Sequence, residues 1–183
     1  MKAITALSHG DSSVLRYEDV PVPEIQAGEI LVKTYAASVN HLEVKMVSQA
    51  VTTKGKEAFP QEFPWIPGFD FAGTVENAGN NAHGLKAGDK VFGNCQGGSY
   101  AQYLAVPADK VVRKPDTLTM VQAASVPHVG ETAWQAIHTH GQGRAGQRVL
   151  SHGDAGAVGA CAIQSAALAV ADGAGSAAGG DRV

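Results

Sequence analysis

Cysteine is scarce in this chain, and its scarcity excludes several kinds of protein. Only Cys95 and Cys161 occur among 183 residues, too few for a disulfide framework or for a structural zinc lobe of four cysteines. Long apolar runs are scarce as well. The run at residues 1–7 is too short for a signal peptide, and no window approaches a membrane span. We therefore expect a reducing, cytoplasmic setting with no membrane segment.

Clusters of basic residues are also missing. The formal net charge is -3, and the sequence contains no run of Lys or Arg, so we expect no nucleic-acid-binding surface. Apolar residues make up 44% of the chain, enough to bury a core, while charged residues make up 17% and glycine occurs 22 times. This composition is typical of a β-rich, turn-rich fold with a glycine-rich ligand site. The length predicts one domain, or one domain and part of a second.

Short apolar runs separated by turn residues fill the first 115 or so residues. The runs with the composition of β-strands lie at residues 29–36, 70–76, 91–93, 99–106 and 111–113. A short helix is expected at residues 41–48. Many short strands separated by turns are typical of a barrel-like β domain.

The pattern changes after residue 118. Thr119 and Gln122 stand three positions apart and predict a capping box for a helix at residues 120–126. A second helix is expected at residues 132–140, and a strand at residues 148–150. A glycine turn and a helix at residues 160–168 follow that strand. This order predicts a β-rich domain over residues 1–127 joined to the start of an α/β domain over residues 128–183.

The glycine turn is the most specific signal in the sequence. It reads Ser151-His152-Gly153-Asp154-Ala155-Gly156-Ala157-Val158-Gly159. A strand, a glycine turn and a helix open a dinucleotide-binding unit, in which backbone N–H groups and the positive helix end meet a pyrophosphate. The residues predicted to bind the cofactor are Gly153, Asp154, Ala155, Gly156, Ala157, Val158 and Gly159.

Asp154 departs from the dinucleotide-binding pattern. A carboxylate about 4 Å from a phosphate charge is repelled by roughly 4 kcal/mol at an effective dielectric constant near 20. Either its side chain turns outward or nucleotide binding is weak.

Several short motifs, taken together in order and spacing, indicate a family. They are Ser38-Val39-Asn40, residues 67–73, residues 88–93, residues 98–101, residues 123–127, Thr132-Ala133-Trp134 and the glycine turn. On these motifs the chain resembles the zinc-free quinone oxidoreductase branch of the medium-chain dehydrogenase/reductase superfamily. The resemblance implies a GroES-like β-barrel catalytic domain at residues 1–127, followed by the first β-α unit of an incomplete Rossmann domain at residues 128–183. The chain would then be a truncated copy.

The same resemblance implies the chemistry. NADPH, or alternatively NADH, would reduce a small quinone or an α,β-unsaturated carbonyl. Zinc-binding members of the superfamily place Cys where Asn40 stands and His where Phe69 stands, and neither residue present here can replace them. His138 and His140 are the nearest approach to a ligand pair, and two His at that spacing are expected to be solvated. We therefore expect no metal.

Three residues are the candidate catalytic groups. In a zinc-free site the negative charge on the substrate carbonyl needs hydrogen-bond donors, and Asn40 offers two amide N–H groups. Lys45 offers a positive charge, and Thr132 offers a hydroxyl to the nicotinamide ribose or amide. Each has a structural alternative: Asn40 in a turn, Lys45 in solvent and Thr132 as a helix cap. Asp70 either orients a neighbouring group or has a structural role in capping or backbone hydrogen bonding.

Two other functions stay open at this point. The chain could be a non-catalytic GroES-like domain that packs against a partner or against itself, and a homodimer is one such arrangement. A zinc alcohol dehydrogenase is disfavoured by the residues at positions 40 and 69.

Overall fold

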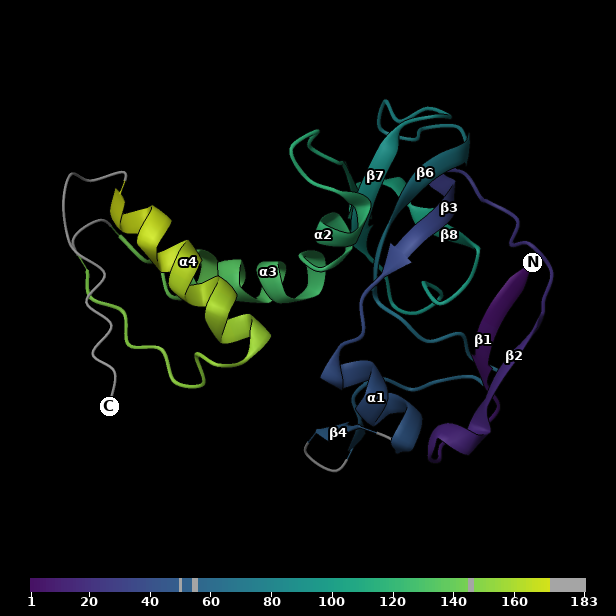
Figure 1. Cartoon of the computed structure of the whole chain (residues 1–183), viewed down its shortest axis with the longest axis horizontal. Coiled ribbons are helices and arrows are strands. Elements are labelled where there is room, and N and C mark those ends of the chain that lie inside the picture. The colour runs from purple at the N-terminus through teal and green to yellow at the C-terminus, as the bar shows by residue number, and fades with distance from the viewer. Residues whose placement is uncertain (50, 54–55, 145–146, 172–183) are drawn as a thin grey trace. The chain divides into compact units, whose positions relative to one another are not determined.

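A five-stranded antiparallel sheet organises the first part of the chain. The computed structural model describes residues 1–49, 51–53, 56–144 and 147–171 (Figure 1). The chain divides into two compact units, Met1–Pro127 and His128–Val183. In the first unit the strand order is β8-β3-β6-β7-β9. The strands are β3 (Glu29–Ala37), β6 (Asp70–Ala78), β7 (Lys90–Asn94), β8 (Tyr103–Pro107) and β9 (Val111–Arg113).

The alternation of side chains along β3 explains its place in the sheet. Ile30 and Val32 are fully buried, whereas Lys33 and Tyr35 face solvent, as expected for a strand with one face on the core. The pairing of β3 with β6 shifts register between Leu31 and Val32 and between Thr34 and Ala36. Such irregularities bend a sheet and increase its twist, so they contribute to the curvature of this barrel-like unit.

Smaller elements surround this sheet. Strands β1 (Lys2–Ala6) and β2 (Leu15–Asp19) pair around the short helix η1 (Ser12–Val14), and β4 (Thr52–Thr53) pairs with β5 (Lys56–Glu57). Helix α1 spans His41–Ser48, the expected bounds, and η2 spans Ala108–Lys110. The sequence patterns do not predict β2, β4 or β5.

Two groups of buried residues form the core of the first unit. The larger group lies within the sheet and includes Phe71, Val75 and Val91. The smaller one forms where α2 (Met120–Ala124) packs against β3, β6 and β7 (Figure 1). There Ala72 meets Ala123 and Ala124; small side chains on both sides let the helix approach closely.

The expected capping box of α2 is confirmed. The backbone N–H of Gln122 donates to Thr119 Oγ1 at 3.2 Å, and the N–H of Thr119 donates to Gln122 Oε1 at 2.9 Å. These two bonds satisfy donors that the first turn of a helix leaves without partners.

The second unit is helical in the part that the structure describes. Helix α3 spans Pro127–Trp134 and continues as the π-helix η3 (Gln135–His140); α4 spans Ala157–Ala171. Helix α4 packs against η3, and His138 Nε2 lies 2.8 Å from Ser165 Oγ. The expected helix at residues 132–140 therefore begins earlier, at Pro127, because proline suits the first position of a helix.

The strand predicted at residues 148–150 is wrong. These residues have irregular structure, and the Leu150 side chain is 82% exposed. A β-strand needs a neighbour for its N–H and C=O groups, and the described residues of this unit contain no strand. The helix expected after the glycine turn is present as α4, with longer bounds.

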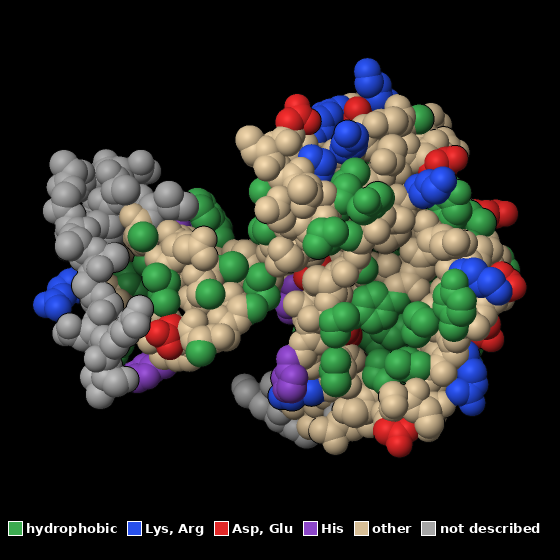
Figure 2. Space-filling view, in the orientation of Figure 1, with side chains coloured by type: hydrophobic (Ala, Val, Ile, Leu, Met, Phe, Trp, Pro, Cys, Tyr) green, Lys and Arg blue, Asp and Glu red, His purple; other side chains and the backbone are tan. Residues whose placement is uncertain are grey.

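Charged and apolar side chains are both visible at the surface of the first unit. Figure 2 shows hydrophobic side chains gathered in the middle of one face of this unit, with Lys, Arg, Asp and Glu around them. Among the described residues, no helix is long and apolar enough to cross a membrane.

Removing the largest fully buried side chain should destabilise the first unit. Phe71 is completely buried in β6, so Phe71→Ala should lower the free energy of unfolding by about 3–5 kcal/mol. Val112→Ala, at an exposed position of β9, should cost less than about 1 kcal/mol. Denaturant unfolding measures both, and equal losses would contradict the core described above.

Candidate functional site

Two carboxylates are buried in the first unit, and polar groups converge on them. Glu43 on α1 is 1% exposed, and Asp70, the first residue of β6, is fully buried. The two carboxylates and the side chains bonded to them form what we call the Asn40 network: Ser38, Asn40, Glu43, Asp70, Asn94 and Tyr100. Buried carboxylates need hydrogen-bond donors to offset the loss of water, and this network supplies them.

Asp70 accepts hydrogen bonds from three neighbouring side chains. Ser38 Oγ donates to Oδ2 at 2.6 Å, and Asn40 Nδ2 donates to the same oxygen at 3.0 Å. Asn94 Nδ2 lies 3.4 Å from Oδ1. Of the two roles considered for Asp70, these contacts support the orientation of neighbouring side chains.

Glu43 engages both Asn40 and Tyr100 through a single oxygen. Its Oε1 accepts from the Asn40 backbone N–H at 2.9 Å, from Asn40 Nδ2 at 3.3 Å and from the Tyr100 hydroxyl at 3.0 Å. Asn40 and Glu43 thereby form a capping box that starts α1. Among the described residues, Glu43 Oε2 and Ser99 Oγ are buried without a hydrogen-bond partner.

Burial and the nearby carboxylates affect the pKa of Tyr100. Burial raises the pKa of the Tyr100 phenol well above its usual range, and the charge of Glu43 and its hydrogen bond raise the pKa further. Its hydroxyl also lies 3.1 Å from the carbonyl oxygen of Ser38. At neutral pH the phenol is therefore a hydrogen-bond donor.

The predicted catalytic residues come from both units, Asn40 and Lys45 from the first and Thr132 from the second. The Asn40 amide donates to Asp70, Ser38 and Glu43. Lys45 is exposed on α1, and its side chain makes no hydrogen bond or ion pair with the described residues. Thr132 lies inside α3, where its hydroxyl donates to the His128 carbonyl at 2.7 Å, so its alternative role as a helix cap is wrong.

The backbone beside Asp70 is tightly packed. Gly68 has a φ of +96°, and a Cβ there would overlap Ser99 Oγ and the Tyr100 ring. Cys95 donates from Sγ to the Phe69 carbonyl at 3.0 Å. Burial raises the pKa of the Cys95 thiol to about 12, so this sulfur is an inert, neutral part of the packing.

The glycine turn of the second unit contains one residue in the left-handed conformation and one hydrogen bond across the turn. Gly153 has a φ of +80°, and the N–H of Gly156 donates to the Gly153 carbonyl at 3.0 Å. A Cβ on Gly159 would overlap that carbonyl and lie 2.7 Å from Asp154 Cα. The turn therefore packs directly on the first turn of α4, whose N–H groups are suited to a pyrophosphate. Asp154 is exposed.

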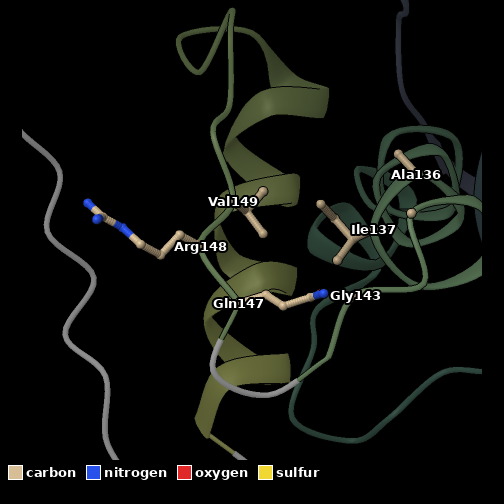
Figure 3. A pocket seen from close by; sticks show the side chains of 7 residues that line it. Ala136, Ile137, Gly143, Gln147, Arg148 and Val149 are labelled. Atoms are coloured by element: carbon tan, nitrogen blue, oxygen red, sulfur yellow. The ribbon is translucent and has the colours of Figure 1, made fainter.

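A shallow pocket of about 440 Å³ lies elsewhere in the second unit, between η3 and residues 147–149. Figure 3 shows Val149 and Ile137 pointing toward one another there, while Arg148 points away. Gln147 Oε1 accepts from the Arg144 N–H at 2.8 Å. Apolar and polar residues both line the pocket, among them Ile137, Val149 and Gln147.

Metal ligands are not grouped in the part of the chain that the structure describes, since no three His, Cys, Asp or Glu side chains there could hold one ion. His138 stacks on Trp134 with ring centroids 4.0 Å apart and bonds to Ser165.

The sequence reasoning missed Glu43, Asn94 and the place of Tyr100 in the Asn40 network. Glu43 stands three residues after Asn40, the spacing of a capping box, so its bond to the Asn40 backbone could have been anticipated. The contact of Tyr100 with Glu43 spans 57 positions of sequence, and no local pattern signals it.

Comparisons with known proteins agree on one family. Residues 26–116 match the alcohol dehydrogenase GroES-like domain. The chain is 36% identical to 2-methylene-furan-3-one reductase of Solanum lycopersicum, over 91% of this chain and 44% of that protein. It is 34% identical to quinone oxidoreductase of Mus musculus, over 91% of this chain and 49% of that protein.

Solved structures give the same result. A mycobacterial protein complexed with NADPH superposes with a TM-score of 0.80 at 32% identity, over 93% of this chain and 50% of that one. The chain thus spans about half the length of the relatives that it matches.

The raised pKa of Cys95 predicts slow thiol chemistry. With a pKa of about 12, the thiolate fraction at pH 8 is roughly one in ten thousand. In a Cys161→Ser background, iodoacetamide should therefore label Cys95 in the folded protein at least about 100-fold more slowly than after unfolding in guanidinium. Mass spectrometry follows the labelling, and similar rates in the two states would contradict the buried, neutral thiol.

Proposed function

Because this chain belongs to the medium-chain dehydrogenase/reductase superfamily, in the branch that contains quinone oxidoreductases, we propose that it takes part in NADPH-dependent reduction. The substrate is a small quinone or α,β-unsaturated carbonyl, which fits the printed activities of the relatives from mouse and tomato. The observation that carries the proposal is the glycine turn, with Gly153 at positive φ and Gly159 packed against the turn without a side chain.

The two units divide the work in this proposal. Residues 1–127 form the GroES-like catalytic domain, and residues 128–183 form the partial Rossmann domain. Residues 153–159 bind the pyrophosphate through backbone N–H groups. The exposed Asp154 suits the outward orientation that limits its repulsion of the phosphates. The cofactor, when bound, supplies a hydride to the substrate; NADPH is favoured because a similar structure contains it, with NADH as the alternative.

Asn40 is the proposed donor to the substrate carbonyl oxygen. Its Nδ2 group has two hydrogens but three acceptors, of which Ser38 Oγ at 3.2 Å and Glu43 Oε1 at 3.3 Å are the longer contacts. One of these longer contacts can be exchanged for the substrate oxygen, while the bond to Asp70 at 3.0 Å keeps the amide in place.

Lys45 and Thr132 complete the proposed set. Lys45 adds a positive charge close in sequence to Asn40 and makes no ion pair with the described residues. Thr132 already donates its one hydroxyl hydrogen to His128. It therefore offers lone pairs, and accepts a hydrogen bond from the carboxamide or ribose of the cofactor.

Zinc has no part in the proposed reaction. Asn40 and Phe69 occupy the positions at which zinc-binding members of the superfamily carry Cys and His, and amide and phenyl groups are not zinc ligands in such sites. A cytoplasmic location and a homodimer remain predictions from the sequence.

Cofactor titration tests the proposal. NADPH should bind to the full chain with a shift in its fluorescence. Gly159→Ala should weaken binding at least about tenfold, because the added methyl displaces the turn from α4. Gln164→Ala, an exposed change on α4, is the matched control and should leave binding unchanged. The absence of binding at millimolar NADPH would leave the non-catalytic GroES-like domain as the function of this chain.

Loss of the Asn40 amide should slow the reaction. If the full chain oxidises NADPH with a simple quinone, Asn40→Ala should lower kcat by about 10²–10³-fold, the usual effect of removing one oxyanion donor. Asn77→Ala, at an exposed position on β6, should leave kcat unchanged. A kcat for Asn40→Ala within about twofold of the parent would remove Asn40 from the mechanism.

A further inference from the structure

One oxygen of Glu43 collects more hydrogen-bond donors than a helix cap requires. Within a capping box the glutamate side chain has only one task, which is to accept a hydrogen bond from the Asn40 backbone N–H. Here Oε1 also faces Asn40 Nδ2 and the Tyr100 hydroxyl, at 3.3 and 3.0 Å. The additional contacts link the helix start, the amide of Asn40 and a strand-adjacent tyrosine through a single atom.

The burial of Glu43 is costly for a residue with only a capping role. Its side chain is 1% exposed, and its second oxygen has no hydrogen-bond partner among the described residues. No Lys, Arg or His of the described chain forms an ion pair with it. A glutamate at this third helical position of a capping box can serve from the surface, where a carboxylate keeps its water, so burial points to a task in the interior.

The orientation of the Asn40 amide depends on its acceptors. Nδ2 lies between Asp70 Oδ2 and Glu43 Oε1, at 3.0 and 3.3 Å. If the amide rotated by half a turn, its carbonyl oxygen would face two carboxylate oxygens and both bonds would become repulsive. Asp70 alone fixes one hydrogen of Nδ2; Glu43 supplies the second acceptor and also anchors the Asn40 backbone at 2.9 Å.

We propose that Glu43 is a positioning residue. It anchors the Asn40 backbone N–H and holds the second Nδ2 hydrogen, at the longer distance of 3.3 Å, until the substrate carbonyl oxygen replaces it, while Asp70 keeps the first hydrogen. The role of Glu43 in reduction rests on the proposed function, but the positioning itself is a property of this chain without cofactor. Tyr100 supports the arrangement, since its hydroxyl donates to Glu43 Oε1 from a position 57 residues away in the sequence.

Hydrogen exchange of the full chain, measured by NMR without cofactor, tests the positioning directly. Glu43→Ala should accelerate exchange of the Asn40 Nδ2 hydrogens and backbone N–H by at least about tenfold, because both lose an acceptor. Glu43→Gln keeps the size and one acceptor oxygen, so it should restore most of the protection of the backbone N–H. Glu76→Gln, at an exposed position on β6, is the control and should change neither.

Titration of Tyr100 gives a second readout, which reports the contact between Glu43 and the Tyr100 hydroxyl on which the inference depends. Removal of the Glu43 charge favours the phenolate, so both Glu43 variants should lower the pKa of Tyr100 toward its ordinary value. The ring resonances of Tyr100 report this shift, with the exposed Tyr17 and Tyr35 as internal references.

The outcomes separate positioning from simple helix capping. Glu43→Ala could instead accelerate exchange of all backbone N–H groups of α1 equally, and exchange of the Asn40 Nδ2 hydrogens by no larger factor. In that case Glu43 only caps the helix and the inference is wrong. If Glu43→Ala does not fold, Glu43→Gln decides, since an unchanged Tyr100 titration in that variant overturns the contact on which the inference depends. Neither readout needs turnover, so a chain without reductase activity leaves this test intact.

Discussion

The burial of two carboxylates, Glu43 and Asp70, constrains the first unit more than any other feature. Each needs donors in an interior that offers little water, and the donors come from separate pieces of chain. Ser38 follows β3, Asn40 begins α1, Asn94 ends β7 and Tyr100 precedes β8. Satisfying the carboxylates therefore fixes how α1 meets the sheet. The exposed Lys45 and the partly exposed Asn40 owe their positions to charges that solvent does not reach.

In the proposed function the second unit binds an anion with backbone groups alone. Its glycine turn would contribute N–H groups and the end of a helix, and no charged side chain would be required to attract the anion. Side-chain chemistry in one unit and backbone chemistry in the other are typical of enzymes in which the cofactor performs the difficult step and the protein supplies orientation. The chain spans about half the length of the relatives it matches.

Local signals in the sequence predicted local structure well. Three local features were predicted, because each depends on neighbours within a few positions. They are the strand at residues 29–36, the helix at residues 41–48 and the capping pair Thr119 and Gln122. Residues 148–150 failed for the opposite reason: their composition suits a strand, but strand formation depends on a partner. The Asn40 network was recognised only in part, since Asn40 and Asp70 were singled out, while Tyr100 reaches Glu43 through the folding of the barrel.

The close packing of Gly159 on Gly153 and Asp154 has a consequence for how this protein can vary. A side chain at position 159 is tolerated only if the preceding turn moves away, and the turn can move only by giving up the left-handed conformation of Gly153. These three positions therefore behave as one mutational unit, in which the first substitution determines which others are acceptable. Single replacements in this turn are for this reason accommodated most easily at the exposed Asp154.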